Sequence, residues 1–248
     1  MDDHINALAK EVGAAYDHAM FRRRSLYGAL GFLNLGYWKG VDDSVELAQI
    51  NLIETLVSFF PDKSGNVLDV ACGTGASSRY LTKYFEPARI TGINISERQL
   101  EACRVIAPGC DFRLMDAASL EFPDASFDNI LCIEAAFHFV TRDRFFAEAY
   151  RVLKPGGRLA MSDLLHDRHL FDAWAPAFLP KDNFLPSVAS DEEKLRAAGF
   201  SVVQVEDSTE LCIGALKRFT TRKAQAGQDV STEIFDHYIA SCMMYAIK

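Results

Sequence analysis

The stretch Val67-Leu68-Asp69-Val70-Ala71-Cys72-Gly73-Thr74-Gly75 decides the fold of this chain. An apolar run leads into two closely spaced glycines, and a helical pattern follows over 76–84. Glycines at such a turn let the backbone approach a ligand, and the helix behind them offers free N–H groups at its N-terminus. The stretch therefore predicts a strand, a glycine turn and a helix that bind a ligand where they join.

Working outward from this turn, short apolar runs alternate with amphipathic segments. The predicted strands cover 66–71, 89–93, 111–115, 126–133, 158–165, 201–205 and 241–247. The predicted helices among them cover 76–84, 96–105, 142–153, 191–198, 210–223 and 232–239. Such alternation indicates βαβ units. We predict an α/β fold, Rossmann-like and doubly wound, with a mostly parallel seven-stranded sheet, an antiparallel last strand at or near an edge, and an N-terminal helical lid.

Two further helices are predicted before this core, over 6–20 and 45–60, with an aromatic-rich loop at 31–38 between them. After the fifth strand comes an irregular stretch over 166–188 that contains Phe171, Trp174, Phe178 and Phe184. We expect one domain over 1–248. Its parts are the helical lid at 1–62, the ligand-binding core at 63–165, and a substrate-lid insert with the rest of the sheet at 166–248.

The composition and charge of the chain limit the classes of function that it can have. The 248 residues are 49% hydrophobic and 24% charged, with a net charge of −8. These values exclude a disordered chain and disfavour a nucleic-acid partner. The six cysteines form no closely spaced pair, the first residues do not resemble a signal peptide, and no apolar run is long enough to span a membrane. We expect a cytoplasmic protein without a membrane span, and homo-oligomerisation is left open.

Sites for two classes of ligand are built on a strand, a glycine turn and a helix. A dinucleotide site prefers a third glycine where Ser78 stands, and an acid near the end of the second strand, where this chain has Asn94. The segment from Asp69 to Gly75 instead resembles the D-x-G-x-G-x-G motif of class I S-adenosylmethionine-dependent methyltransferases, with Ala71 in place of the first glycine. The similarity extends to Asp116-Ala117 and to Leu153-Lys154-Pro155-Gly156-Gly157, and so covers roughly residues 60–165.

The resemblance implies S-adenosyl-L-methionine as cofactor and assigns residues to its parts. Gly73 and Gly75 would pack against the methionine end, with Asp69 near its ammonium. Asp116 would accept a hydrogen bond from the adenine amino group, although an Asx turn is the alternative. The cofactor-binding residues expected in this way are Asp69, Ala71, Gly73, Gly75, Asn94, Ile95, Gln99, Asp116, Ala117, Glu134, Tyr37 and Trp38.

Asn94 stands where the family usually has an acid that holds the ribose hydroxyls. Asn94 can still donate and accept hydrogen bonds, but without charge assistance. Subgroups that lack the acid place a Gln a few residues on, and Gln99 matches that pattern. Gln99 is therefore the expected ribose ligand, with a solvated helix residue as the alternative.

The candidate catalytic residues are His138, just after the fourth strand, and Asp163, at the end of the fifth. Transfer to a hydroxyl needs a base that titrates near neutral pH, and imidazole meets this need. Asp163 could orient the imidazole, as a triad carboxylate does. This pairing and the segment 33–38 are similar to natural-product O-methyltransferases that act on sugar, polyketide or peptide hydroxyls. A hydrogen-bonded core histidine is the alternative for His138.

The expected substrate is a small, largely apolar molecule under the aromatic roof of the 166–188 stretch. No metal is expected, because His166 and His169 have no evident third ligand. Two alternatives stay open: a C- or N-methyltransferase on the same scaffold, and a nucleotide-dependent oxidoreductase or cofactor-binding module.

Overall fold

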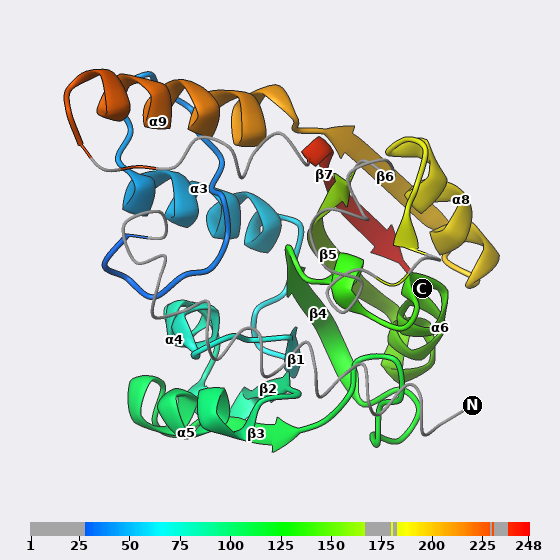
Figure 1. The fold of residues 1–248 in the computed structure, drawn as a ribbon. Helices are drawn as coiled ribbons and strands as arrows, with labels where there is room; N and C mark the ends of the chain where they lie inside the picture. The colour runs from blue at the N-terminus through cyan, green and yellow to red at the C-terminus, as the bar shows by residue number, and fades with distance from the viewer. Residues whose placement is uncertain (1–27, 167–179, 181–182, 229, 231–237) are drawn as a thin grey trace.

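The computed structural model describes residues 28–166, 180, 183–228, 230 and 238–248. The strands are β1 (Val67–Val70), β2 (Ile90–Asn94), β3 (Asp111–Leu114), β4 (Phe127–Ile133), β5 (Leu153–His166), β6 (Val202–Asp207) and β7 (Tyr238–Ile247). They form one seven-stranded sheet in the order β3-β2-β1-β4-β5-β7-β6 (Figure 1). β7 lies one position in from the edge and runs antiparallel to both β5 and β6, whereas the other strand pairs are parallel. The predicted fold class is confirmed.

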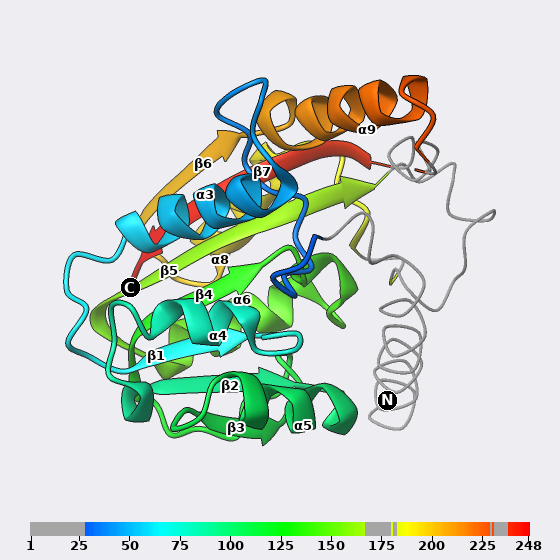
Figure 2. The ribbon, with the colours of Figure 1, turned by 90° about the vertical axis from the view of Figure 1, so that its left-hand side faces the viewer.

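Helices cover both faces of the sheet, as Figures 1 and 2 show. One face carries α3 (Val45–Ser58), α4 (Ala76–Leu81), α5 (Glu97–Ile106) and α9 (Ala215–Gln225). The other face carries α6 (Arg142–Val152) and α8 (Ala189–Ala197). Short helical turns lie at η1 (Pro87–Arg89), η2 (Ala136–His138) and η5 (Glu210–Gly214). Among the described helices, none is long and apolar enough to cross a membrane.

Alternation along the central strands sends successive side chains to opposite faces. In β5, Leu159 and Met161 join the cluster under α6 and α8, whereas Ala160 joins the cluster under α3 and α4. Both faces are buried, which is why the central strands read as nearly continuous apolar runs. The same alternation decides where the polar residues at the ends of these strands point.

Where the structure describes them, the predicted elements match the observed ones with small shifts. The helix predicted over 45–60 is α3, and its buried side packs on the sheet, with Leu52, Ile53, Leu56 and Val57 in the core. The helix predicted over 6–20 lies outside the described residues. Of the helix predicted over 232–239, only Tyr238 and Ile239 are described, and both belong to β7.

Candidate active site

A cavity lies at the carboxyl ends of β1, β2 and β4. The sheet order reverses direction between β1 and β4, and ligands of open α/β sheets bind at such a switch point. The lining comes from the loop before α3, the glycine turn, the ends of β2 and β3, and the segment after β4. It includes Gly31, Phe32, Leu33, Asn34, Asp69, Ala71, Gly73, Asn94, Ile95, Gln99, Asp116, Ala117, Glu134 and His138.

The glycine turn has the backbone geometry that its sequence predicts. Gly73 and Gly75 adopt φ of 56° and 90°. A Cβ on Gly75 would lie 2.9 Å from Cys103 Cα, so only glycine lets α4 start this close to α5. Ala71 also adopts a left-handed φ of 56°, at the position of the first glycine in the D-x-G-x-G-x-G motif that this segment resembles. A left-handed alanine costs about 1–2 kcal/mol, which marks this backbone as one held in place by its surroundings.

Asp69 sits beneath the turn and is almost completely buried. Its Oδ2 accepts hydrogen bonds from the hydroxyls of Ser77 (2.7 Å) and Ser78 (2.6 Å), at the start of α4. Burial raises the pKa of Asp69 to about 6, against the opposing effect of these two hydrogen bonds. A neighbouring cation would therefore stabilise its ionised form.

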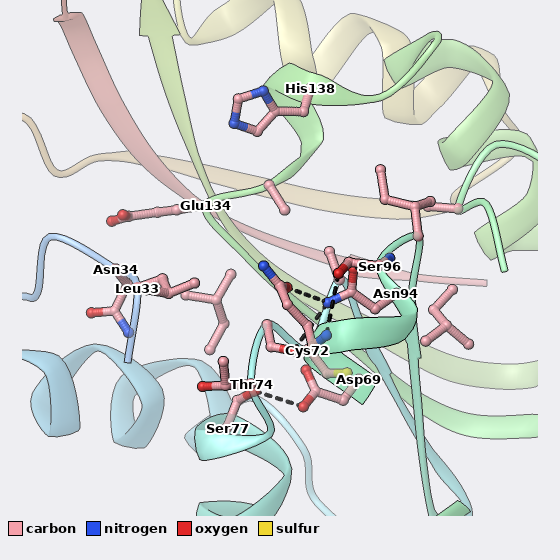
Figure 3. A pocket seen from close by; sticks show the side chains of 18 of the residues that line it. Leu33, Asn34, Asp69, Cys72, Thr74, Ser77, Asn94, Ser96, Glu134 and His138 are labelled. Carbon is pink, nitrogen blue, oxygen red and sulfur yellow. Dashed lines mark hydrogen bonds between the residues drawn. The ribbon is translucent and has the colours of Figure 1, made fainter. Parts of the chain in front are cut away.

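Asn94 and Gln99, both predicted as cofactor-binding residues, are hydrogen-bonded to each other. Asn94 Nδ2 donates to Gln99 Oε1 (2.7 Å) and to the carbonyl of Gly73 (3.0 Å), and Asn94 Oδ1 accepts from the N–H of Ser96 (3.1 Å). Gln99 is buried, so it is not a solvated helix residue. Both residues line the cavity, and Asn94 is labelled there in Figure 3.

Asp116 and Ala117 line the far part of the same cavity, after β3. Asp116 Oδ1 accepts from the N–H of Ala118 (2.8 Å), which is the Asx turn considered from the sequence. The turn fixes the carboxylate at the cavity wall, so this structural role is compatible with ligand binding.

Glu134 and His138 lie on the segment that follows β4, and Figure 3 shows both on the side of the cavity away from Asp69 and Asn94. Glu134 is buried with a φ of 47°, and its Oε2 accepts from the N–H of Leu35 (2.8 Å). Its Oε1 is buried without a hydrogen-bond partner among the described residues. Burial raises the pKa of Glu134 to about 8. His138 closes the turn η2, and its ring lies 4.0 Å from that of Phe137, centroid to centroid.

We predicted that Asp163 orients His138, but its carboxylate oxygens bind other partners. Its Oδ2 accepts from Arg142 Nε (2.6 Å), and its Oδ1 accepts from the N–H groups of Phe137 (3.2 Å) and Leu164 (2.9 Å). The reason is the alternation of β5, which turns Asp163 to the same face as Met161 and Leu165, toward the start of α6. Asp163 is fully buried and is not part of the cavity lining.

Tyr37 and Trp38 also lie outside the cavity lining. Trp38 donates from Nε1 to the carbonyl of Leu35 (3.0 Å), and its ring packs on Phe219 of α9 at 4.8 Å. Tyr37 packs against the cluster under α3. The aromatic-rich loop at 31–38 does reach the cavity, through its residues 31–34.

The cavity suits a cationic ligand. Among the described residues that line it, three carry carboxyl groups (Asp69, Asp116 and Glu134) and none is Lys or Arg. The buried, unpartnered Glu134 Oε1 adds an acceptor without a donor. Within the part of the chain that the structure describes, no cluster of His, Cys, Asp and Glu could hold a metal ion. A glycine turn, a pair of hydrogen-bonded amides and an acidic wall fit a positively charged nucleoside, which is the kind of cofactor that S-adenosylmethionine is.

The fold and this site define a class I methyltransferase architecture, and comparisons with known proteins agree. Residues 68–161 match the family described as "Methyltransferase domain". The chain is 31% identical over 242 residues to the O-methyltransferase cnsE of Penicillium expansum, covering 91% of this chain and 85% of that protein. It is 32% identical over 205 residues to the 27-O-demethylrifamycin SV methyltransferase of Amycolatopsis mediterranei (strain S699), covering 79% and 68%.

Among solved structures, the 4+2 cyclase SpnF has a TM-score of 0.75 at 24% identity, covering 97% of this chain and 96% of that one. This likeness shows the shared fold. The chain belongs to the S-adenosylmethionine-dependent methyltransferases, and S-adenosyl-L-methionine is its cofactor.

Sequence reasoning missed Phe32, Leu33 and Asn34 as individual lining residues, although it singled out their loop. It also missed Arg142, the buried partner of Asp163. An arginine at the first position of a helix carries no signal for burial, so nothing in the local pattern identified it.

Proposed function

We propose that this enzyme methylates a hydroxyl group of a small, largely apolar molecule of the secondary-metabolite type, with His138 as general base. The observation that carries the proposal is that His138 lines the same cavity as the paired amides Asn94 and Gln99. The lining residues that follow His138 in the chain, Phe139 and Val140, are apolar. The relatives named above as O-methyltransferases support the same choice.

The cofactor supplies a methyl group on a cationic sulfur. The hydroxyl oxygen forms the new bond to that methyl carbon, and the electron pair of the broken carbon–sulfur bond goes to sulfur. The proton of the hydroxyl must leave as its oxygen gains positive charge, and His138 takes it. The rest of the rate comes from holding the acceptor in line, and the walls of the cavity do this.

The remaining site residues take supporting roles in this proposal. Asn94 and Gln99 hold the ribose, Ile95, Asp116 and Ala117 hold the adenosine side, and Asp69 with Ala71, Gly73 and Gly75 forms the methionine end. Glu134 faces the positive charge of the cofactor. Asp163 supports His138 indirectly, through the N–H of Phe137 and through Arg142.

The test begins with a screen of small molecules that offer hydroxyl, amine or carbon acceptors, against a cofactor labelled in its methyl group. With the acceptor found there, His138→Ala should lower kcat by about 10²–10⁴-fold. The matched control is His166→Ala, because the His166 ring also packs on Phe137, at 4.8 Å, but is not part of the cavity lining. H166A should keep the rate.

Calorimetry with S-adenosylhomocysteine should give H138A the affinity of the unaltered enzyme, since His138 is not assigned to the cofactor. If H138A methylates the acceptor as fast as the unaltered enzyme, His138 is not the base. Transfer only to carbon or nitrogen acceptors in the screen would replace the hydroxyl proposal with one of the two other chemistries.

A further inference from the structure

The turn that carries His138 is held from outside by one buried amide. Asn183 is 5% exposed. Its Nδ2 donates to the carbonyls of Phe139 (2.5 Å) and Phe137 (3.0 Å), with a longer contact to Ala136 (3.4 Å). These carbonyls lie on both sides of His138 in the chain. One amide group therefore fixes the backbone immediately before and after the imidazole-bearing residue.

Arg142 sets the orientation of that amide. The backbone N–H of Arg142 donates to Asn183 Oδ1 (3.2 Å), and Arg142 Nη1 donates to the backbone carbonyl of Asn183 (2.5 Å). Since an N–H only donates and a carbonyl only accepts, Asn183 must turn its NH₂ group toward the His138 turn. A flipped amide would place oxygen against oxygen on one side and N–H against N–H on the other.

Arg142 is itself held by buried partners. It is 1% exposed, and besides the bond from Nε to Asp163 it donates from Nη2 to the carbonyl of Leu164 (3.1 Å). Asp163 in turn accepts from the N–H of Phe137. The His138 turn is thus fixed at its carbonyls by Asn183 and at an N–H by Asp163, and Arg142 joins the two.

We propose that Asn183 is a positioning residue for His138: its side-chain amide, oriented by Arg142, fixes the turn from Ala136 to Phe139 and so sets the direction of the imidazole in the cavity. The proposal rests on the proposed role of His138 as general base. A displacement of about 1 Å at a reacting group can cost 10² in rate, so a residue that never touches the substrate can matter this much.

The competing view is that Asn183 only stabilises the fold, as many buried amides do. A matched control separates the two. Asn129 is 3% exposed, and its Nδ2 donates to the carbonyl of Asp62 (3.1 Å), but it lies near the start of β4, at the end of the sheet opposite the cavity. Asn183→Ala and Asn129→Ala should both lower Tm, because each removes a buried amide together with the hydrogen bonds that it donates to backbone carbonyls.

Catalysis should separate them. With the hydroxyl acceptor found in the screen, N183A should lower kcat by roughly 10–10²-fold with little change in KM for the cofactor, whereas N129A should keep kcat. If N183A fails to fold, Asn183→Ser keeps a donor on a shorter side chain and should give a smaller loss in kcat. A kcat for N183A or N183S equal to that of N129A would overturn the proposal.

Two measurements tie the effect to His138. In the H138A background, N183A should cost no further rate, because two residues that act through one group are not additive. In complexes with S-adenosylhomocysteine, the imidazole resonance of His138, assigned by its loss in H138A, should shift or broaden in N183A and stay in place in N129A.

This second measurement needs no acceptor, so it distinguishes the two possible failures. An imidazole signal that moves in N183A while H138A retains full activity would preserve the positioning of His138 and remove its role as base. An imidazole signal that is identical in N183A and the unaltered enzyme would overturn the positioning role, whatever the activity of H138A.

Discussion

The side-chain amide of Asn94 donates to Gln99 Oε1 over 2.7 Å, and the same nitrogen donates to the carbonyl of Gly73 over 3.0 Å. The end of β2, the start of α5 and the glycine turn are joined by this one amide group. A carboxylate at position 94 would instead face two acceptor oxygens. The geometry thus explains why an amide, rather than the usual acid, is compatible with Gln99 at this site.

We expect Asn94 and Gln99 to act as one unit in cofactor binding. Asn94→Ala and Gln99→Ala should each weaken the binding of S-adenosylhomocysteine by roughly fivefold or more, the effect of losing a hydrogen bond of about 1 kcal/mol. The double variant should lose less than the sum, with a coupling of about 0.5–3 kcal/mol. Calorimetry of the four proteins measures this cycle. Glu97→Gln, a change on the exposed side of α5, is the control and should leave the affinity unchanged. Strict additivity would show that the two amides bind independently.

Glu134 should make the stability of the free protein fall as pH rises. Its folded-state pKa, about 8, lies above that of an unfolded glutamate, so the folded state binds the extra proton between these values. The free energy of unfolding therefore decreases with pH across roughly pH 4.5–8. Glu134→Gln removes this dependence, and the variant should match the unaltered protein near pH 5 but exceed its stability by a few kcal/mol, to order of magnitude, at pH 8.

Urea denaturation of both proteins from pH 5 to 8 tests this. Asp69 and Asp191 have raised pKa values of about 6 and about 7 and contribute slopes of the same sign, so the difference between the two curves isolates Glu134. Glu193→Gln, at an exposed position of α8, should give a constant difference. A constant difference for E134Q as well would mean that Glu134 is ionised throughout.

The protonation of the Glu134 carboxyl group should depend on the charge of the bound cofactor. A cation bound beside Glu134 lowers its pKa, so binding near pH 7 should release a proton. S-adenosylmethionine carries a positive sulfur that S-adenosylhomocysteine lacks, and it should release more protons. Calorimetry in buffers of different ionisation enthalpy counts them. In E134Q the difference between the two ligands should vanish. Equal proton release from both ligands in the unaltered enzyme would place the sulfur away from Glu134.

Much of the fold could be predicted because its signals are local. The buried strands read as apolar runs, and the glycines after Val70 mark the turn that binds the cofactor. The residues around the cavity follow, since parallel strands bring their carboxyl ends to one edge. The hydrogen-bond partners of those residues cannot be predicted from the strand pattern. Asp163 could be placed at this edge, but its partner Arg142 comes from a helix start on the other side of a loop.

The roles of residues in irregular segments were harder still to predict from the sequence. Asn183 lies in a stretch without helical or strand periodicity, so no pattern indicated that its amide reaches the backbone around His138. Tyr37 and Trp38 were chosen as aromatic residues of the correct loop. The rings of Tyr37 and Trp38 instead pack against α3 and α9, and residues 31–34 of the same loop line the cavity.

Removing Arg142 should destabilise the protein in a pH-dependent way. Arg142 lies between two buried carboxyl groups, with Nε 2.6 Å from Asp163 and 3.7 Å from Asp191. Burial and the charge of Asp163 already raise the pKa of Asp191 to about 7. Arg142→Met leaves both carboxylates without a counter-charge, which costs about 3–5 kcal/mol when such a buried pair is broken.

That loss should be largest near pH 8 and smaller near pH 5.5. Without the arginine the folded-state pKa values rise further, so the folded protein takes up protons that the unfolded chain does not, and stability decreases as pH rises through this window. Adding Asp163→Asn and Asp191→Asn to R142M should recover much of the loss at pH 8, since the buried charges are then gone.

Arg196→Met is the control, because it removes only a surface ion pair with Glu192, and it should change stability by less than about 1 kcal/mol at either pH. Denaturation at both pH values measures these differences, and a loss in R142M that is the same at pH 5.5 and pH 8 would mean that packing, rather than charge, explains the burial of Arg142.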